Sequence, residues 1–513
     1  MQEILPHPTG ETNSQGLVPL NQPVTVETFG GRIHVEWNPD AAVTPLGQLP
    51  FFIEFLHVSG LYESWVTQCP LRWTSPNAPL KRDVLGTLLL SILSGHQRYA
   101  HINALRGDGV NPELLGMTKV VSEDSVRRSL LALDEDSGVR WLQNSLEQVY
   151  GPLLSVPWIL DADTTVKTLY GKQEGAEVGY NPHKPGRPSH TYHTYMIANL
   201  RLILDVEVHS GKQVASKHSA PGLWSLLNRL PRDQWPTLIR GDRDWGTEAN
   251  MQQAEQSNVA YLFKLRLTKN IRRTIERLML GSYWEKAGQG WQASETTVRL
   301  SGWSRSRRII VMRRQLPKNL AVVSESQEGP KQLSFTELCD DITVYEYSVL
   351  VTTLDLEVLS IAQLYRDRAD AENNFDELKN HWGWGGFTTQ DIKRCRIMAR
   401  ITALIYNWWS LFMRLADPEQ HTEAITSRPL MLYAIAKQTR HAGQTKLKVS
   451  HAHSEAGKVE ECYRRISAFF RELWATAEQL TTLQRWCRIL SAALVKYLGG
   501  RQLQPPNCIP APS

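Results

Sequence analysis

The sequence predicts an α/β protein in which a mixed sheet is flanked by helices, interrupted by a mainly β insertion, and enclosed by helical N-terminal and C-terminal domains. Two patterns in the 513 residues lead to this prediction. Short runs rich in branched and aromatic residues, typical of strands, alternate with a helical stretch after about residue 151. Apolar residues at helical spacing dominate from about residue 48 to 150 and return towards the C-terminus.

The N-terminal part of the chain predicts an arm followed by helices. Residues 1–47 are rich in Pro, Gly, Thr and Asn, which is typical of a loosely ordered lead-in. Residues 48–150 predict a helical domain, because "LKRDVLGTLLLSILSG" has the apolar period of a helix and "SEDSVRRSLLAL" begins with Ser122 as a candidate N-cap. Arg127 and Arg128 on the second helix suggest a helix-turn-helix-like DNA-binding domain. The alternative is an ordinary amphipathic helix.

The remainder predicts a sheet core with an insertion. Residues 151–268 form its first part, with strands in "VPWILDADTTVKTLYG", "PTLIRGDRDWG" and "NVAYLFKLRL", a strand or hairpin in "YMIANLRLILDVEVHSG", and a helix in "TEANMQQAEQS". Residues 269–345 predict a mainly β insertion, because "TVRLSGW" and "RRIIVMRR" alternate as strands do. Residues 346–415 complete the core, beginning with the strand "YSVLVTT". Residues 416–513 predict a helical domain that ends in a Pro-rich tail.

Composition narrows the class of protein. Hydrophobic residues make up 42% of the chain and the net charge is +5, so the chain can bury real cores and is not a histone-like polycation. The six cysteines are scattered without a C-x-x-C pair, as in a reduced cytoplasmic protein. No signal peptide is evident, and the most apolar run, Ile401 to Met413, is too short to cross a bilayer. We therefore expect a cytoplasmic protein without membrane contact.

The stretch "YRDRADAENNFDELK", from Tyr365 to Lys379, predicts a helix with a polar stripe at the rim of the core. A helix turns by about 100° per residue, which places Tyr365, Arg368, Glu372 and Lys379 within an arc of roughly 60°. Charges beside an apolar face must be paired, bind a metal or meet an anionic ligand. The alternative is a solvated surface. The wheel assigns four further residues to the solvent side: Arg366, Asp370, Asn373 and Glu377.

Two predicted strands supply further carboxylates. In "WILDADTTV", Asp161 and Asp163 project from the same face, because side chains of a strand alternate with a period of two. In "LIRGDRDWG", Asp242 follows an apolar strand. Each acid alone is typical of a turn or cap. Metal-dependent phosphodiester chemistry, however, requires carboxylates from several elements.

Together with the helix, these acids resemble the DDE transposases of bacterial insertion sequences, whose catalytic core is RNase H-like. Tyr365, Arg368, Glu372 and Lys379 meet the Tyr-x2-Arg-x3-Glu-x6-Lys signature of one group of that family. The "DTT" that begins at Asp163 resembles the first-aspartate motif and "GDRDWG" the second. "YGKQEGAEVGYNPHKPGRPSHTYH" is similar to the segment that follows the first aspartate in one branch. Asp161 and Asp163 both remain candidates for the first ligand, and Asp163 is preferred because it directly precedes Thr-Thr.

The resemblance implies a metal-dependent reaction on DNA. Asp163, Asp242 and Glu372 would be the catalytic residues and would hold two divalent ions, Mg²⁺ with Mn²⁺ as substitute. One ion would activate water or a 3′-hydroxyl for in-line attack, and the other would stabilise the leaving oxygen. Arg368 and Lys379 would grip phosphates. Tyr365 would stack on, or hydrogen-bond to, a displaced end nucleotide.

The resemblance also implies partners and a setting. A transposase binds the terminal inverted repeats of its insertion sequence, cleaves and transfers DNA strands, and acts on target DNA. We expect a cut-and-paste route for this protein. Pairing two ends implies a homodimer in the DNA complex. A bacterial transposase would work in the cytoplasm in association with the nucleoid.

Basic residues along the chain predict the DNA track. Phosphate contacts give affinity without sequence information, so clustered cations suffice. Two loop cations, Lys184 and Arg187, fall in "NPHKPGRPSH", and "SGWSRSRRIIVMRR" is a further basic run. The run "KLRLTKNIRRTIER" supplies Lys264, Arg266, Lys269, Arg272 and Arg273. For each run the alternative is a solvated face.

Three alternative functions would also use some of these residues. A catalytically silent, domesticated DNA-binding protein with a transposase fold would keep the fold without cleavage. A glycosidase with paired carboxylates would not explain Arg368 and Lys379 beside Glu372. A zinc site at His183, His190 and His193 lacks zinc-ligand spacing and a Cys partner.

Overall fold

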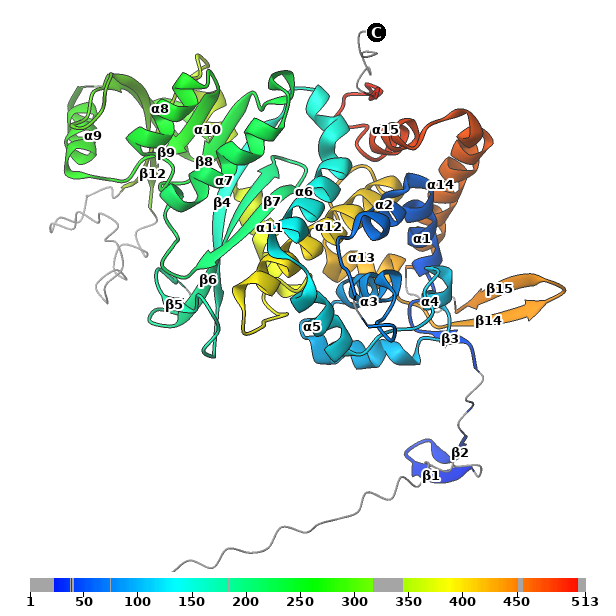
Figure 1. Cartoon of the computed structure of the whole chain (residues 1–513). Coiled ribbons are helices and arrows are strands. Elements are labelled where there is room, and N and C mark those ends of the chain that lie inside the picture. The colour runs from blue at the N-terminus through cyan, green and yellow to red at the C-terminus, as the bar shows by residue number, and fades with distance from the viewer. Residues whose placement is uncertain are drawn as a thin grey trace, which may run out of the picture.

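The computed structural model describes residues 23–505 except residues 37, 39, 40, 74, 183, 282, 317–344 and 451–454. Most of the predicted N-terminal arm and most of the Pro-rich tail therefore lie outside the described residues. The sheet and the main body of helices occupy opposite ends of the molecule (Figure 1). The predicted mixed α/β class is confirmed.

One large mixed sheet of ten strands runs in the order β10-β11-β12-β13-β9-β8-β4-β6-β5, and β7 pairs with β6. The strands β4, β6 and β7 are antiparallel, whereas β8 runs parallel to β4 and β9 parallel to β8. These five central strands are β4 (Ile159–Thr168), β6 (Pro188–Ile197), β7 (Leu202–Ser210), β8 (Leu238–Gly241) and β9 (Ala260–Lys264). Four of them, β4, β7, β8 and β9, fall in segments that the sequence predicts as strands, whereas only the last three residues of β6 do.

The connections between these strands are short or helical. The pair β6 and β7 forms the hairpin left open by the sequence, turning at Asn199 and Arg201, whose φ angles are 65° and 56°. Helix α7 (Ser216–Arg229) leads from β7 towards β8, and α8 (Glu248–Gln256) leads from β8 to β9. Parallel strands need such crossovers, so the helix expected before "NVAYLFKLRL" is where the topology requires it.

The predicted β insertion extends the same sheet and begins with a helix. Strand β13 pairs with β9, and β12, β11 and β10 follow in antiparallel order. The helix was missed, although Ile271, Ile275 and Leu278 are buried at helical spacing. The elements are α9 (Lys269–Gly281), β10 (Glu285–Gly288), β11 (Trp291–Val298), β12 (Arg307–Gln315) and β13 (Tyr345–Thr352).

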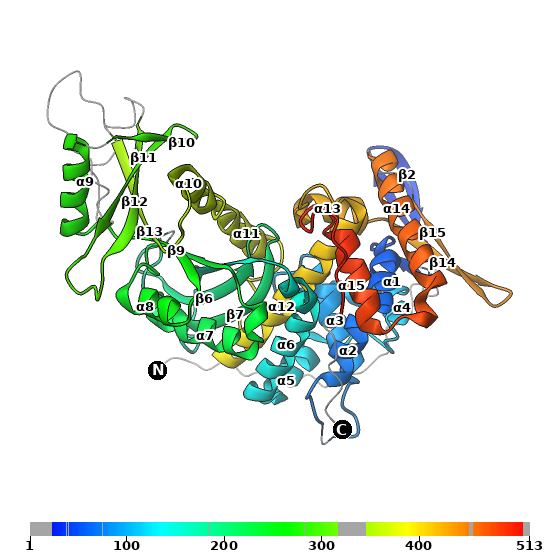
Figure 2. The ribbon, with the colours of Figure 1, turned by 90° about the horizontal axis from the view of Figure 1, so that it is seen from above.

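Helix α12 (Ile392–Ala416) joins the sheet to the helices. It packs against β7 on one side and α6 (Glu135–Tyr150) on another, and almost all of its residues are buried. Arg400 forms a buried ion pair with Asp205 of β7, with 2.8 Å between Nε and Oδ1. The view from above shows α12 between the sheet and the helices (Figure 2). The expectation that the run "ITALIYNWWSLFM" is a buried helix is confirmed.

The N-terminal helices agree with their sequence signals. Ser122 caps α5, and its hydroxyl accepts a hydrogen bond from the Ser125 N–H at 3.2 Å. Gly95, just after α3, has a φ of 74°, which suits the predicted Gly stop. The helices are α1 (Leu49–Ser59), α2 (Leu61–Gln68), α3 (Lys81–Leu93), α4 (Asn111–Leu114) and α5 (Glu123–Ala132), with a 3₁₀ helix at Tyr99–Gly107. Among the described residues, no helix is long and apolar enough to cross a bilayer.

The C-terminal part is not wholly helical, contrary to the prediction. A hairpin of β14 (Ala436–His441) and β15 (Gln444–Val449) projects from it, and β3 (Val43–Thr44) pairs with β14. Its turn residues, Ala442 and Gly443, have positive φ angles of 49° and 75°. Such a two-residue turn is the commonest hairpin connection, so Ala-Gly between alternating residues was the missed signal. The remaining elements are the hairpin β1 (Val24–Thr28) and β2 (Gly31–Val35), α13 (Ala424–Met431), α14 (Ala456–Ala475) and α15 (Thr482–Ala493).

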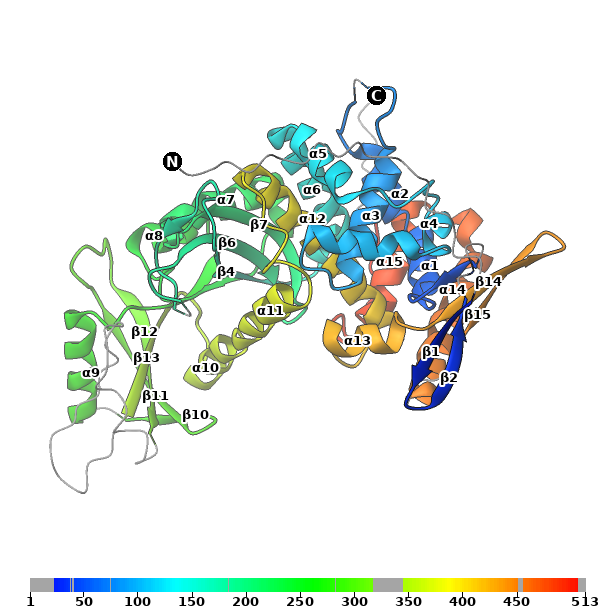
Figure 3. The ribbon, with the colours of Figure 1, turned by 90° about the horizontal axis from the view of Figure 1, so that it is seen from below.

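The polar stretch from Tyr365 to Lys379 is not one continuous helix. It comprises the end of α10 (Val358–Arg366) and α11 (Ala369–Asn380), which lie end to end beside the sheet (Figure 3). Between them the backbone tightens to three-residue turns: the Arg368 N–H donates to the Tyr365 carbonyl at 3.2 Å and the Ala371 N–H to the Arg368 carbonyl at 3.0 Å. The break changes the angular relation between residues before and after it.

Candidate functional site

Asp163 and Asp242 lie side by side on neighbouring parallel strands. The register pairs Asp161 with Arg240 and Ala162 with Gly241, so the next step along both chains brings Asp163 beside Asp242. Asp242 directly follows β8 and precedes a turn in which its carboxylate accepts the Asp244 N–H at 3.0 Å. The sequence thus places two acids on adjacent strands, as metal-dependent chemistry would require.

Arg240 distinguishes Asp161 from Asp163. Its Nε and Nη2 each lie 2.6 Å from one carboxylate oxygen of Asp161, and it also donates to the Leu364 carbonyl. Arg240 is 0% and Asp161 3% exposed. Both oxygens of Asp161 are therefore engaged by a buried fork. Asp163, on the same strand face, instead accepts a hydrogen bond from the Thr164 N–H at 2.8 Å and pairs with Arg368.

Arg368 sits between the acids. Its Nη2 lies 2.7 Å from Oδ2 of Asp163, and the side chain is almost fully buried. Burial opposes its charge, but the neighbouring Asp163, Tyr365 and Asp242 raise its pKa overall. Its Nε is buried without a hydrogen-bond partner among the described residues. A buried guanidinium with an unused donor is suited to an additional anionic ligand.

The pKa values of both aspartates are raised, which favours their protonated forms. Burial raises the pKa of Asp163 to about 6; Arg368 lowers it and the nearby Asp242 raises it again. Burial likewise raises the pKa of Asp242, against Arg368 and together with Asp244. Two buried carboxylates in one place repel each other, and a cation relieves that repulsion.

Glu372, the third predicted carboxylate, is among the charges that affect the pKa of Tyr365. Burial raises the pKa of Tyr365 to about 12, Arg368 lowers it, and the carboxylates of Asp242, Asp163 and Glu372 raise it further. All three acids therefore act on one phenol. Glu372 is exposed in the first turn of α11, just after the helix break. The break thus lies between Arg368, which pairs with Asp163, and Glu372 on α11.

The donors fit a hard divalent cation by their chemistry. Carboxylate oxygens are the ligands that Mg²⁺ prefers. The pKa values of Asp163 and Asp242 are raised mainly by burial, and a bound cation would favour their charged forms. Within the described part of the chain, no three acidic, His or Cys side chains converge closely enough to form a ready metal cluster. The Arg368 contact with Asp163 would have to open for that carboxylate to bind a cation.

Basic residues lie around the acids. Lys264 at the end of β9 has a pKa lowered by burial and by Arg243 and Arg368, while Asp242 raises it. A cavity of about 600 Å³ next to Asp242 is lined by Lys217, Arg243 and Arg266, with Asp244 paired to Arg266 at 2.5 Å. Arg243 was missed in the sequence, although it lies within "GDRDWG".

Two predicted loop cations gather on an exposed tyrosine. The charged groups of Lys184 and Arg187 lie 5.1 and 5.7 Å from the ring centroid of Tyr170, which is 69% exposed. Arg243 lies 5.9 Å from the ring of Tyr180, another exposed residue. Cations over exposed aromatic faces are typical of nucleic-acid surfaces. The segment after the first aspartate therefore presents cations and exposed aromatic rings together.

Other predicted residues lie apart from the acids. Lys379, near the end of α11, is half-buried, and burial lowers its pKa while Asp376 raises it. Arg127 pairs with Glu123 at 3.5 Å and covers the ring of Tyr99. Arg128 is on the same helix, α5, among the N-terminal helices (Figure 1). The remaining cations, Lys269, Arg272 and Arg273, are on α9 at the outer end of the insertion (Figure 1).

Glu377 corrects the helical wheel. It was assigned to the solvent side but is 2% exposed. Its carboxylate accepts hydrogen bonds from Trp382 Nε1 at 3.0 Å and the Ala424 N–H at 2.9 Å, and lies 2.8 Å from His421 Nε2. The wheel failed because α13 and the preceding loop, distant in sequence, cover this face of α11. Nearby, Arg201 pairs with Asp370 at 2.7 Å.

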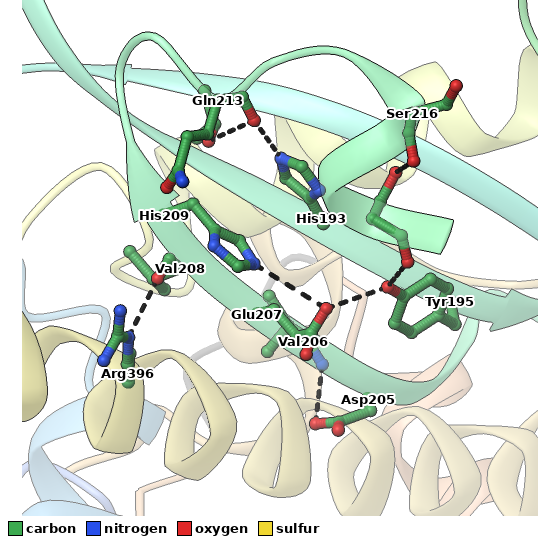
Figure 4. Close-up of polar contacts among 12 residues, drawn as sticks. His193, Tyr195, Asp205, Val206, Glu207, Val208, His209, Gln213, Ser216 and Arg396 are labelled. Atoms are coloured by element: carbon green, nitrogen blue, oxygen red, sulfur yellow. Dashed lines mark hydrogen bonds and ion pairs between the residues drawn. The ribbon is translucent and has the colours of Figure 1, made fainter. Parts of the chain in front are cut away.

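The histidines of β6 are structural. His193 Nε2 lies 2.7 Å from the Gln213 carbonyl, and burial and the neighbouring His209 lower the pKa of His193 to about 3. His209 Nε2 lies 3.7 Å from Glu207, which accepts a hydrogen bond from Tyr195 (Figure 4). His183 lies outside the described residues. These contacts tie β6 and β7 to the chain entering α7 and leave no trio of zinc ligands among the described side chains.

The fold and site define a mixed α/β protein with carboxylates on two adjacent parallel strands and a third on a neighbouring helix. The family described as Transposase DDE domain group 1 matches residues 80–470, and the chain belongs to this family of DDE transposases.

Among solved structures, the chain is similar to a piggyBac transposase, determined by cryo-EM as a synaptic complex with hairpin DNA. The two share 12% identity at a TM-score of 0.37, over 92% of this chain and 87% of that one. No curated protein matches the sequence.

Proposed function

We propose that this protein is an active DNA transposase that binds the ends of its mobile element and cleaves and transfers DNA strands. The placement of Asp163 beside Asp242, with Arg368 paired to Asp163 and with Glu372 on the helix that follows Arg368, carries this proposal. Family membership supports it. The strand order β7-β6-β4-β8-β9, antiparallel on one side and parallel on the other, supports an RNase H-like core.

Asp163, Asp242 and Glu372 are the residues that would hold divalent cations, Mg²⁺ or Mn²⁺. When bound, such cations stabilise the negative charge that develops on a phosphate under attack. The protein's own contribution is to keep two carboxylates buried and close together, with Asp161 held away by Arg240. Protons must leave Asp163 and Asp242 before either can act as a ligand.

Arg368 and Tyr365 would position the DNA strand. Arg368 has an unused Nε donor in a buried setting, which suits a phosphate oxygen next to the scissile bond. Tyr365 keeps its proton, because burial and the carboxylates hold its pKa at about 12, so it acts as a hydrogen-bond donor or stacking surface. Lys264 and Arg243 add positive charge beside Asp242.

The partners follow from the reaction. Double-stranded DNA, as terminal inverted repeats and as target, is the substrate, and Lys184 and Arg187 on Tyr170 offer part of its track. Joining two ends calls for a homodimer in the DNA complex. We also propose a cut-and-paste route and a place in the bacterial cytoplasm, associated with the nucleoid. The same proposal assigns the chain to the group with the Tyr-x2-Arg-x3-Glu-x6-Lys signature.

The test is cleavage of a labelled duplex that carries the element's own ends, with Mg²⁺ or Mn²⁺. Wild type is compared with Glu372→Ala and with Asp376→Ala, an exposed acid on the same helix. Metal-dependent cutting that is lost in Glu372→Ala, with binding intact, and kept in Asp376→Ala supports the proposal. Equal cutting by all three proteins removes Glu372 from the chemistry. Binding without cutting by wild type favours the silent DNA-binding protein.

A further inference from the structure

One face of the β14–β15 hairpin carries lysines without acidic partners. Lys437 stands opposite Lys448, and Lys446 stands opposite Thr439. Because strand side chains alternate, all three lysines lie on the same face, and all three are exposed. Within the described part of the chain, none of their ammonium groups takes part in an ion pair. This set of residues is called the lysine face below.

The lysine face is unfavourable for the free protein. Like charges directly opposite each other on paired strands destabilise a hairpin. No Asp or Glu occurs between Glu423 and Glu455, so the sequence around the hairpin supplies no compensating charge. An anionic partner on this face would remove the repulsion.

The opposite face and the base hold the hairpin in place. Arg440 pairs with Glu113 on α4, and Gln438 Nε2 lies 3.5 Å from the same carboxylate. At the base, β3 pairs with the start of β14. The hairpin of β14 and β15 projects away from the body in two perpendicular views (Figures 1 and 3). The lysine face is thus presented on a fixed, protruding support.

The hairpin is connected through α13 to α11, the helix that carries Glu372. Glu377 on α11 accepts a hydrogen bond from the Ala424 N–H at the start of α13, at 2.9 Å. The chain passes from α13 into β14 after four residues, 432–435. Glu372 and the lysine face therefore belong to one connected set of elements.

We propose that the lysine face grips the phosphate backbone of the same DNA duplex whose end reaches the carboxylate site. This inference rests on the proposed function. A two-stranded ribbon has the dimensions of the major groove, and lysines bind phosphates as point charges without reading sequence. The hairpin anchors the duplex at a distance from the reacting phosphate.

The test measures binding of the end duplex as a function of salt. The variant carries Lys437→Gln, Lys446→Gln and Lys448→Gln. The control carries Arg32→Gln, Arg464→Gln and Lys496→Gln, which remove the same charge from exposed ion pairs outside the hairpin. Each lost phosphate contact lowers the slope of log Kd against log salt by about 0.9, so we expect a loss of about 2.7 in the variant and none in the control.

Hydroxyl-radical footprinting locates the contact. We expect the lysine-face variant to lose protection in one block of backbone while protection at the cleavage end stays, with no fall in Tm. An unchanged slope and footprint in this variant, or an equal change in the control, overturns the inference while leaving the proposed function standing. If wild type and both variants bind no duplex, the proposed function itself fails. The single Lys448→Gln variant removes one of the three lysines, the one opposite Lys437, and must show about a third of the slope change.

Discussion

Arg240 binds both carboxylate oxygens of Asp161, two positions before Asp163 on the same strand face. The pair is buried on both sides. One aspartate thus serves the fold, and the other is left for a ligand.

Replacing Arg240 by Met leaves a buried carboxylate without its partner. We expect a loss of about 3–5 kcal/mol in the free energy of unfolding, measured with denaturant. The double variant Arg240→Met, Asp161→Leu removes the stranded charge and should recover most of that loss. An Arg240→Met protein as stable as wild type would show that the ion pair does not hold these strands.

Divalent cations should stabilise the protein more strongly at higher pH. A carboxyl whose pKa is raised on folding, as that of Asp163 is to about 6, binds protons more tightly in the folded state. Its contribution to stability is therefore present at low pH and is lost between about pH 4 and 6. A cation competes with that proton, so Mn²⁺ should raise Tm more at about pH 7.5 than at about pH 5.

Asp163→Asn should remove most of this cation-dependent rise in Tm, whereas Asp161→Asn tests the alternative ligand. Asp376→Asn, on the exposed face of α11, is the control. A rise that persists in Asp163→Asn and disappears in Asp161→Asn would reverse the assignment of the first ligand.

Glu377 should stabilise the attachment of α11 to α13. Glu377→Gln weakens its contacts with His421, Trp382 and Ala424 and should cost about 1–3 kcal/mol. Burial acts to raise the pKa of Glu377, but hydrogen bonds from His421, Trp382 and Ala424 lower it below its usual value overall.

The pH dependence of this contribution follows from that direction. Because the folded pKa is depressed, the unfolded chain binds more protons, and the stability that Glu377 provides is present above about pH 4.5 and lost as pH falls through the folded pKa. Denaturant curves of wild type and Glu377→Gln should therefore differ by a constant amount at neutral pH and converge in acid. A difference that grows in acid would contradict this assignment.

Arg307 should anchor the insertion to α8. It is buried and lies 2.5 Å from Glu248 and 2.7 Å from Glu255. Arg307→Met should destabilise this region by about 3 kcal/mol, visible as faster hydrogen exchange in β12. The neighbouring Arg308→Gln breaks a partly exposed pair with Glu295 and a hydrogen bond to the Leu354 carbonyl, so it should change stability by about 1–2 kcal/mol, less than Arg307→Met does. Equal exchange in both variants would refute the anchoring role.

Local sequence signals predicted the helices and strands more accurately than they predicted the contacts around each element. The strands of the core, the Ser122 cap and the buried helix α12 followed from periodicity and capping residues. The assignment of Asp163, Asp242 and Glu372 to catalysis stays a prediction, supported by their placement around Tyr365. What local patterns could not give was the partner of each polar group.

Two of the misses were caused by contacts between residues far apart in sequence. Alternation alone put Asp161 and Asp163 on one face, and only Arg240 on another strand separated them. Glu377 looked solvated until α13 covered it. The α10–α11 break was equally invisible, since neither Gly nor Pro marks it. Helix α9 and the β14–β15 hairpin, in contrast, had local signals that were overlooked.

The position of α12 shapes how the chain can be synthesised. Helix α6 is made early and packs against α12, which leaves the ribosome only after the whole sheet and its insertion. Until then α6 can pack against α2 and later against β7, but it lacks its contact with α12. Nascent chains of this protein must pass through a stage in which the first helices await their partner, and chaperones that shield apolar surface are expected to act there. Once α12 is complete, it can pack against both β7 and α6 and so join the sheet to the helices late in synthesis.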